Sequence, residues 1–208
     1  RISLDGTELD SVNSTMYRAP IEIQDHARLK TLATKEGWLK SNTLEYNFYL
    51  QGIQPLKTEL LSPANKDYKA KGATSLTDNQ IGDVDNFRDG NWLGFRENKM
   101  ISQFTFNEKE TPKGVTLIYN KNIGSYLMPP GIVEIWGGEN NSVLKLLTTI
   151  KPEQPSKYSS AKSESISFQF EEPVNVVKII ATPVSKLPTW HSGKGEKGWL
   201  MVSEIIFR

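Results

Sequence analysis

The sequence predicts an all-β protein in which a small, partial β-sandwich module precedes a complete β-sandwich. Apolar and polar side chains alternate along 43–50, 115–119, 165–170 and 200–206. This period of two is typical of strands that bury one face. Between these runs the chain carries clusters of Gly, Pro, Asn and Asp, which favour turns. The clusters occupy 107–114, 129–131, 137–141 and 183–198.

One stretch, 25–37, fits two interpretations. As a helix it has an N-cap at Asp25 and a stop signal at Gly37. As a strand it places Leu29 and Ala33 on one face. The pattern alone does not decide between the two.

The clearest boundary lies at 51–55, where Gly52 and Pro55 interrupt two apolar runs. We therefore divide the chain into a first part, 1–52, and a second part, 54–208. The first part is near the size at which a single core is only marginally stable. The second, with about 150 residues, can bury a full core.

The composition excludes several classes of function. The chain of 208 residues has no cysteine, which excludes disulfides, thiolate nucleophiles and zinc–thiolate sites. Its only histidines are His26, which we place at the surface, and His191, so the most common general base is scarce. A net charge of +1 gives no basis for binding nucleic acid or an anionic membrane. No apolar run approaches the roughly 20 residues of a membrane span.

No catalytic motif is present. The sequence lacks a phosphate loop, a dinucleotide fingerprint and a Ser–His–acid pattern, and its carboxylate pairs are no more frequent than chance allows. We therefore expect that this segment is not an enzyme. Because Arg1 already lies in an apparent strand, we expect a piece of a larger protein that carries any catalytic activity.

The first part resembles a known module. It reads ISLDGTELDSVNSTMYRAPIEI and then LKTLATKEGWLKSNTLEYNF. Both segments are similar to the small β module at the C-terminus of chitobiases and β-hexosaminidases. The resemblance implies a truncated module whose first strand would precede Arg1, and it implies that 25–37 is a strand followed by a turn. We expect Trp38, in EGWLKS, to pack within this module.

The second part, from about Thr58 to Arg208, carries three distinctive segments. They are GATSLTDNQIGDVDNFRDGNWLGF, PPGIVEIWGG and PTWHSGKGEKGWLMVSEIIF. These resemble the discoidin-like, coagulation factor type C (F5/8 type C) domains found after family 20 glycoside hydrolases. Gly198 and Ser203 replace the usual Ala and Asp of that pattern. The resemblance implies a galactose-binding-like jelly-roll β-sandwich.

Loop 75–85 is a candidate cation site, because it is acidic and rich in turn residues. Tight loops present carbonyl oxygens, which Ca²⁺ prefers together with carboxylates. The resemblance implies a structural calcium held by this loop and by a glutamate in the last strand, and Asp78 and Glu204 occupy the matching positions. The family's usual threonine is missing. The alternative is a loop held by Asx turns and a glutamate that accepts backbone N–H groups.

Three loops carry groups that suit a sugar ligand. Carbohydrate recognition needs an aromatic face beside fixed polar groups, and Trp and Tyr supply that face at low entropic cost. The candidate ligand-binding residues are Trp190, His191, Arg88 and Tyr126. His191 has a second interpretation, as a loop residue hydrogen-bonded to the backbone. We assign Trp92 and Trp199 to the core or its rim.

Together these observations predict a non-catalytic, carbohydrate-binding accessory segment of a larger polysaccharide-processing protein, chitobiase-like or β-hexosaminidase-like. By resemblance, that protein is exported. Its partners would be a weakly bound glycan and the other domains of the parent protein. An alternative is a purely structural domain that packs against a missing catalytic domain. A third is a protein or membrane recognition module with Leu127 and Met128 as an apolar spike, although too few basic residues neighbour them to favour a membrane.

Overall fold

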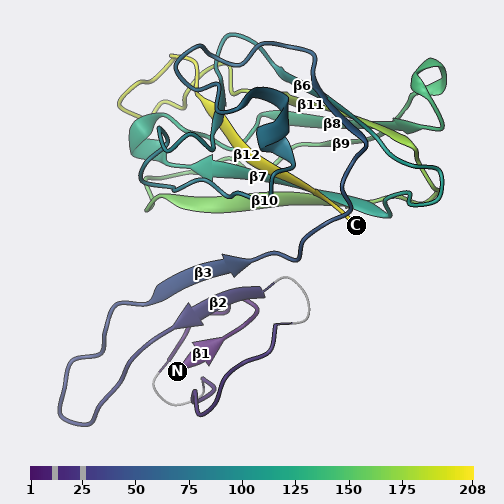
Figure 1. Ribbon diagram of the computed structural model, residues 1–208. Coiled ribbons are helices and arrows are strands. Elements are labelled where there is room, and N and C mark those ends of the chain that lie inside the picture. Colours follow the sequence, from purple (N-terminus) through teal and green to yellow (C-terminus); the bar gives the residue numbers. More distant parts are fainter. Residues whose placement is uncertain (11–13, 24–26) are drawn as a thin grey trace. The chain divides into compact units, whose positions relative to one another are not determined.

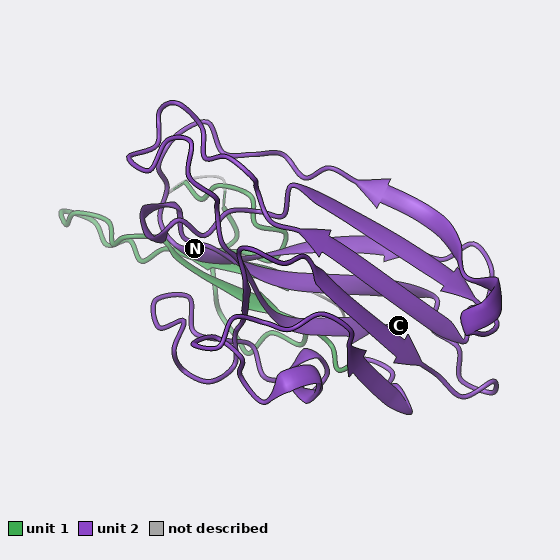
Figure 2. Ribbon diagram, turned by 90° about the horizontal axis from the view of Figure 1, so that it is seen from above, with its two compact units in different colours: residues 1–51 green, residues 52–208 purple. Residues whose placement is uncertain are grey.

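The computed structural model describes residues 1–10, 14–23 and 27–208 of the chain. They form two compact units, Arg1–Gln51 and Gly52–Arg208, shown in separate colours in Figure 2. His26, which we placed at the surface, lies outside the described residues. The described part contains no helix with the length and apolarity that a membrane span requires.

The first unit is a three-stranded antiparallel sheet of β1 (Ile2–Ser3), β2 (Ala27–Thr31) and β3 (Leu44–Phe48), in the order β1-β2-β3 (Figure 1). The strand interpretation of 25–37 is confirmed for its described residues, because Ala27–Thr31 pairs along its whole length with β3.

This unit has a thin core. Leu32 is the one buried hydrophobic side chain among its described residues. Trp38 is 71% exposed, so the prediction that it packs within the module is wrong. It lies in the connection between β2 and β3, beyond both strand ends, and its ring contacts the Lys35 ammonium group, 4.7 Å from the centroid.

The second unit is a sandwich of two antiparallel sheets, and the predicted fold class is confirmed. One sheet has the strand order β10-β7-β12-β5 and the other has the order β4-β6-β11-β8-β9. The strands are β4 (Lys57–Leu60), β5 (Leu93–Phe95), β6 (Met100–Thr105), β7 (Gly114–Lys121), β8 (Ile132–Gly138), β9 (Lys145–Ile150), β10 (Lys162–Gln169), β11 (Val176–Thr182) and β12 (Leu200–Phe207). Three short 3₁₀ helices occur in the connections: η1 (Gly72–Leu76), η2 (Ile123–Ser125) and η3 (Asn141–Val143).

The core lies between the two sheets. The alternation predicted for 115–119 is confirmed, because Val115, Leu117 and Tyr119 all belong to it. Phe207 of β12 packs against Phe104 of β6, with ring centroids 4.8 Å apart. Burial of such aromatic surfaces supplies the main driving force for a sandwich of this size.

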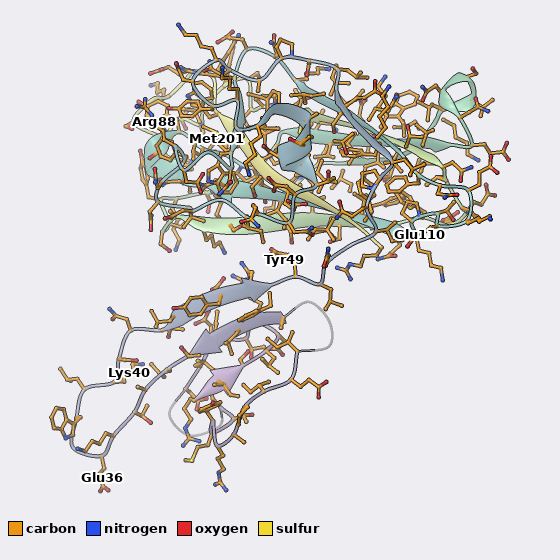
Figure 3. All side chains as sticks on the ribbon, viewed as in Figure 1. Glu36, Lys40, Tyr49, Arg88, Glu110 and Met201 are labelled. Atoms are coloured by element: carbon orange, nitrogen blue, oxygen red, sulfur yellow. The ribbon has the colours of Figure 1, made fainter. Side chains whose placement is uncertain are left out.

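The loops that carry most candidate residues meet at one end of the sandwich. In an antiparallel pair, the end of one strand lies beside the start of its neighbour. β7 therefore ends beside the start of β10, and β11 ends beside the start of β8. The connections 122–131, 151–161 and 183–199 emerge together as a result. Arg88 lies at this end, and Glu110, in the turn between β6 and β7, lies at the opposite end (Figure 3).

Candidate functional site

Three of the four predicted sugar-binding residues lie in one aromatic cluster. The rings of Tyr126 and His191 meet edge-on, with centroids 4.9 Å apart, and Trp190 lies 5.8 Å from His191. Trp190 is half-buried against a small apolar group made of Ile123, Met128 and Leu187. The indole therefore has a fixed position at the loop end of the sandwich.

His191 is 3% exposed, and both of its ring nitrogens bind the backbone. Nε2 donates to the carbonyl oxygen of Ile123 at 2.8 Å, and Nδ1 accepts the N–H of Gly193 at 2.9 Å. This is the arrangement of the second interpretation, in which the histidine fixes the loop. The imidazole ties connection 183–199 to the neighbouring connection 122–131.

The backbone and the ring of Tyr126 are also held in place by their contacts. Its backbone is left-handed, with φ of 68°, and its carbonyl oxygen accepts the N–H of Trp199 at 2.8 Å. Its ring lies against Gly193, where an added Cβ would come within 2.1 Å of Cε1 of the ring. The glycine is therefore required for the close approach of loop and ring.

Tyr158 completes the cluster and was not among the residues predicted from the sequence. Its ring meets Trp190 edge-on, with centroids 5.3 Å apart, and it is 48% exposed. Its hydroxyl donates to Ser192 Oγ at 3.1 Å and accepts the Ser192 N–H at 2.9 Å. The hydrogen bond with the Ser192 hydroxyl, and to a smaller extent the one with the Ser192 N–H, lower the pKa of the Tyr158 hydroxyl. Tyr158 and Trp190 form an aromatic pair at the surface, here called the Trp190–Tyr158 face.

Arg88 belongs to a different group. Its guanidinium lies over the ring of Tyr68, 5.9 Å from the centroid, and Tyr68 meets Trp199 edge-on at 5.3 Å. Arg96 covers the Trp199 ring at 5.6 Å. The structure therefore separates Arg88 from the other three predicted residues.

Several apolar residues of the loops are buried. Trp92 is buried, and its Nε1–H donates to the carbonyl oxygen of Asp83 at 2.9 Å, so its assignment to the core is confirmed. Leu127 and Met128 are each 1% exposed. The prediction that they could form an exposed apolar spike is wrong, because both side chains join buried clusters below the loops.

The two predicted cation ligands meet where loop 75–85 reaches strand β12. The pairing of β12 with β7 shifts by one residue between Val202 and Glu204, which leaves Ser203 as the extra residue of a β-bulge. Val202 and Ile205 both belong to the core cluster. The bulge therefore directs Glu204 away from that core and toward the loop.

Glu204 is 2% exposed, and its Oε2 has no hydrogen-bond partner. Burial, and secondarily the charge of Asp78, raise the pKa of Glu204 to about 8, while hydrogen bonds from the backbone of Gln80 and Asn79 act in the opposite direction. Asp78 itself binds the Lys71 ammonium group at 3.0 Å and accepts the Gln80 N–H at 3.0 Å.

This donor set suits a hard cation in part. A buried carboxylate with a free oxygen, a second carboxylate and a tight loop are ligands that Ca²⁺ uses. Among the described residues, no group of three or more His, Cys, Asp or Glu side chains could hold a metal ion. Backbone carbonyls and water would therefore have to complete the coordination. The predicted Asx turns are also present, since Asp83 accepts the Asp85 N–H at 2.9 Å.

No protein-family model matches the sequence, and no curated protein matches it. Among solved structures, the chain is similar to the CBM32 of AlyQ in complex with 4,5-unsaturated mannuronic acid, with 10% identity and a TM-score of 0.45 over 76% of this chain and 97% of that chain. It is similar to the family 32 CBM of NanJ from C. perfringens in complex with galactose, with 14% identity and a TM-score of 0.44 over 73% and 91%. A third is the C-terminal domain of a chitobiase from Bacteroides fragilis, with 11% identity and a TM-score of 0.42 over 76% and 96%. The likeness is one of fold.

Proposed function

We propose that the second unit binds glycans through the Trp190–Tyr158 face, as a non-catalytic module of a larger, exported polysaccharide-processing protein. The observation that carries this proposal is the aromatic pair itself. The rings of Trp190 and Tyr158 lie together at the loop end of the sandwich. Hydrogen bonds of Ser192 and His191 hold the loop that carries Trp190. Ligand sites are commonly built on loops that a rigid scaffold positions.

The chemistry of the face fits a sugar. The apolar side of a pyranose packs on an aromatic ring, while hydroxyl groups of the sugar exchange hydrogen bonds with neighbouring polar groups. The Tyr158 hydroxyl and Ser192 are such groups. A shallow site of this kind is expected to bind with a Kd near millimolar, or about −4 kcal/mol. Its role is to raise the local concentration of the polymer for an attached domain.

The test compares three alanine variants on a glycan array and in isothermal titration with the best hit. Trp190→Ala and Tyr158→Ala should each abolish retention. Trp38→Ala, which removes an exposed tryptophan from the first unit, should retain binding and serves as the matched control. Because Trp190 is half-buried, its loss should also cost about 1–3 kcal/mol of stability. Tyr158→Ala should leave stability nearly intact, so undiminished binding by this variant would refute the proposal.

We also propose that Asp78 and Glu204, with carbonyl groups of loop 75–85, hold a structural Ca²⁺. The ion would neutralise two adjacent carboxylates and tie the loop to the last strand. The free, buried Oε2 of Glu204 supports this proposal, because an unpartnered buried carboxylate oxygen is costly without a cation. Its test is the effect of Ca²⁺ on the melting temperature of the wild type and of Glu204→Gln at about pH 8.

A further inference from the structure

The two loops that carry the Trp190–Tyr158 face are strongly basic. The connections 151–161 and 183–199 contain five lysines and two glutamates, a local charge of +3 in a chain whose net charge is +1. Glu196 binds Arg96 at 3.1 Å, and Lys197 binds Glu97. One glutamate and one lysine of these loops are therefore paired with residues outside them, and the local charge stays at +3.

Three lysines flank the aromatic residues and are exposed: Lys157, Lys186 and Lys194. Lys157 directly precedes Tyr158, and the N–H of Lys194 donates to the carbonyl oxygen of His191 at 3.0 Å. Within the part of the chain that the structure describes, none of the three forms an ion pair. Their ammonium groups are therefore exposed and not neutralised by a carboxylate of the described residues.

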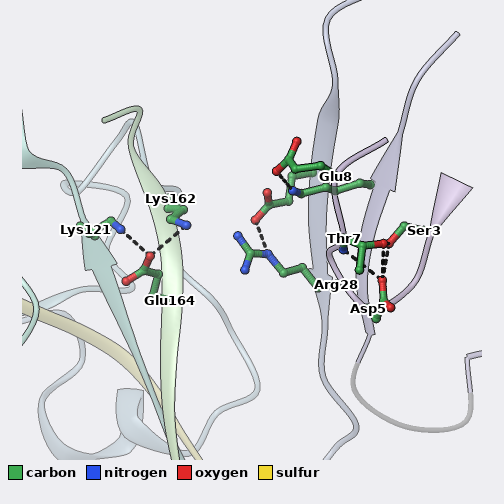
Figure 4. Close-up of polar contacts among 10 residues, drawn as sticks. Ser3, Asp5, Thr7, Glu8, Arg28, Lys121, Lys162 and Glu164 are labelled. Atoms are coloured by element: carbon green, nitrogen blue, oxygen red, sulfur yellow. Dashed lines mark hydrogen bonds and ion pairs between the residues drawn. The ribbon is translucent and has the colours of Figure 1, made fainter. Parts of the chain in front are cut away.

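A further positive charge lies at the base of these loops. Lys121, at the end of β7, and Lys162, at the start of β10, share the single carboxylate of Glu164, at 2.5 and 2.9 Å (Figure 4). Burial raises the pKa of Glu164, but hydrogen bonds from Lys121, Lys162 and Tyr119 outweigh burial and lower it. The cluster thus holds two ammonium groups and one ionised carboxylate.

The neighbouring loop has the opposite sign. Residues 83–92 contain three aspartates and one arginine, Arg88, whereas the nearby Asp78 is paired with Lys71. An anion that approaches this end of the sandwich is therefore repelled by the aspartate-rich loop and attracted to the Trp190–Tyr158 face. Electrostatic complementarity of this kind decides specificity more than it decides affinity.

We propose that the Trp190–Tyr158 face takes an anionic glycan, whose carboxylate or sulfate groups bind Lys157, Lys186 and Lys194 while its sugar rings pack on the two aromatic side chains. This inference rests on the proposed function and specifies its ligand class. Lysine presents a point charge without fixed bidentate geometry, which suits acidic groups spaced along a flexible polymer.

The experiment uses the whole chain and paired polysaccharides in affinity electrophoresis. Polygalacturonate is compared with its fully methyl-esterified form, and chondroitin sulfate is compared with desulfated chondroitin, so that the carboxylate and sulfate sources are tested separately. The K157Q/K186Q/K194Q variant should bind the preferred anionic polymer at least about tenfold more weakly than the wild type. Added salt should weaken wild-type binding, because screening acts on exposed charges.

The matched control is K109Q/K113Q/K145Q, which removes the same charge from the opposite end, where β7 and β9 begin. It should change binding less than about twofold. Equal binding of polygalacturonate and its uncharged methyl ester, or failure of both anionic polymers to bind at millimolar sugar concentration, would overturn the inference. If Trp190→Ala abolishes binding of a neutral glycan and the lysine variant does not, the proposed function stands and this inference fails. Single-stranded DNA that binds as tightly as the polymer, with no effect of Trp190→Ala, would overturn both.

Discussion

Replacement of Glu204 by glutamine tests the electrostatics of the junction between loop 75–85 and β12. In the absence of a cation, the folded protein keeps this carboxyl group protonated up to a pH of about 8, compared with an ordinary value of 4.5 in the unfolded chain. Below pH 4.5 both states are protonated and stability is complete. As the pH rises above that value, the unfolded chain ionises first, so unfolding releases a proton and stability falls until the folded state also ionises.

The magnitude follows from the two pKa values. Each pH unit between 4.5 and 8 costs about 1.4 kcal/mol, so the complete loss is on the order of 4–5 kcal/mol. This is a large fraction of the roughly 5–15 kcal/mol that stabilises a typical domain. Glutamine keeps the shape of the side chain and does not titrate. We therefore expect Glu204→Gln to equal the wild type at about pH 4.5 and to exceed its stability by several kcal/mol at about pH 8.

The assay is urea unfolding, followed by tryptophan fluorescence, in chelator between about pH 5 and 8. Glu171→Gln removes a charge from an exposed site before β11 and serves as the control, for which no pH-dependent difference is expected. If the difference between wild type and Glu204→Gln stays constant across this range, the burial argument for Glu204 is refuted.

The same pair of proteins tests the calcium proposal. Ca²⁺ binds the ionised carboxylate and stabilises only the folded state, so it should raise the wild-type melting temperature most at about pH 8. The increase should be much smaller for Glu204→Gln. An unchanged wild-type melting curve at millimolar calcium, after exhaustive chelation, would contradict the calcium proposal and leave the prediction for the metal-free protein standing.

The isolated peptide 1–51 should be unfolded, whereas 52–208 should fold alone. Among its described residues the small unit buries only one hydrophobic side chain, Leu32, and it leaves an apolar hollow of about 920 Å³. A dispersed amide NMR spectrum from the peptide would contradict this. Gly193→Ala should lower stability by about 1–3 kcal/mol in thermal unfolding, since the new Cβ would overlap a ring that the loop holds in place. The control is Gly124→Ala, whose Cβ would meet no atom closer than 3.9 Å. Equal melting temperatures for the two variants would contradict this prediction and show that the loop moves to accommodate the added methyl group.

The fold was the most predictable feature, for a physical reason. A strand that buries one face alternates in polarity along the chain. The alternation therefore predicts both the strand and the side chains that face the core, which are Val115, Leu117 and Tyr119. The exposure of an apolar side chain in a loop cannot be predicted from such a local pattern. Trp38 and Met128 are both apolar loop residues, but the first is exposed and the second is buried. The difference depends on whether another segment covers the loop.

The candidate sites were predictable in the same limited way. Turn residues around Trp190 marked a loop, and the loop does hold Tyr126 and His191 together. Tyr158 was missed because its contact with Trp190 joins two connections that are distant in sequence, and the surrounding Ser- and Lys-rich stretch has no pattern. The bulge at Ser203, which turns Glu204 toward the loop, is equally invisible in the alternation of β12.

Strand β12 joins the two candidate sites. It starts directly after Trp199, whose backbone binds Tyr126 and Met128, and it carries Glu204 a few residues later. The strand pairs with β7 on one side and with β5 on the other, so ionisation of Glu204 acts on the same strand that anchors the aromatic loop. If chelation at about pH 8 lowers stability enough to unfold part of the protein, glycan binding falls with the folded fraction, without any contact between calcium and sugar. The Glu204→Gln variant separates these cases, because in chelator it should still bind the glycan if the effect acts through stability, and should not bind it if calcium contacts the sugar.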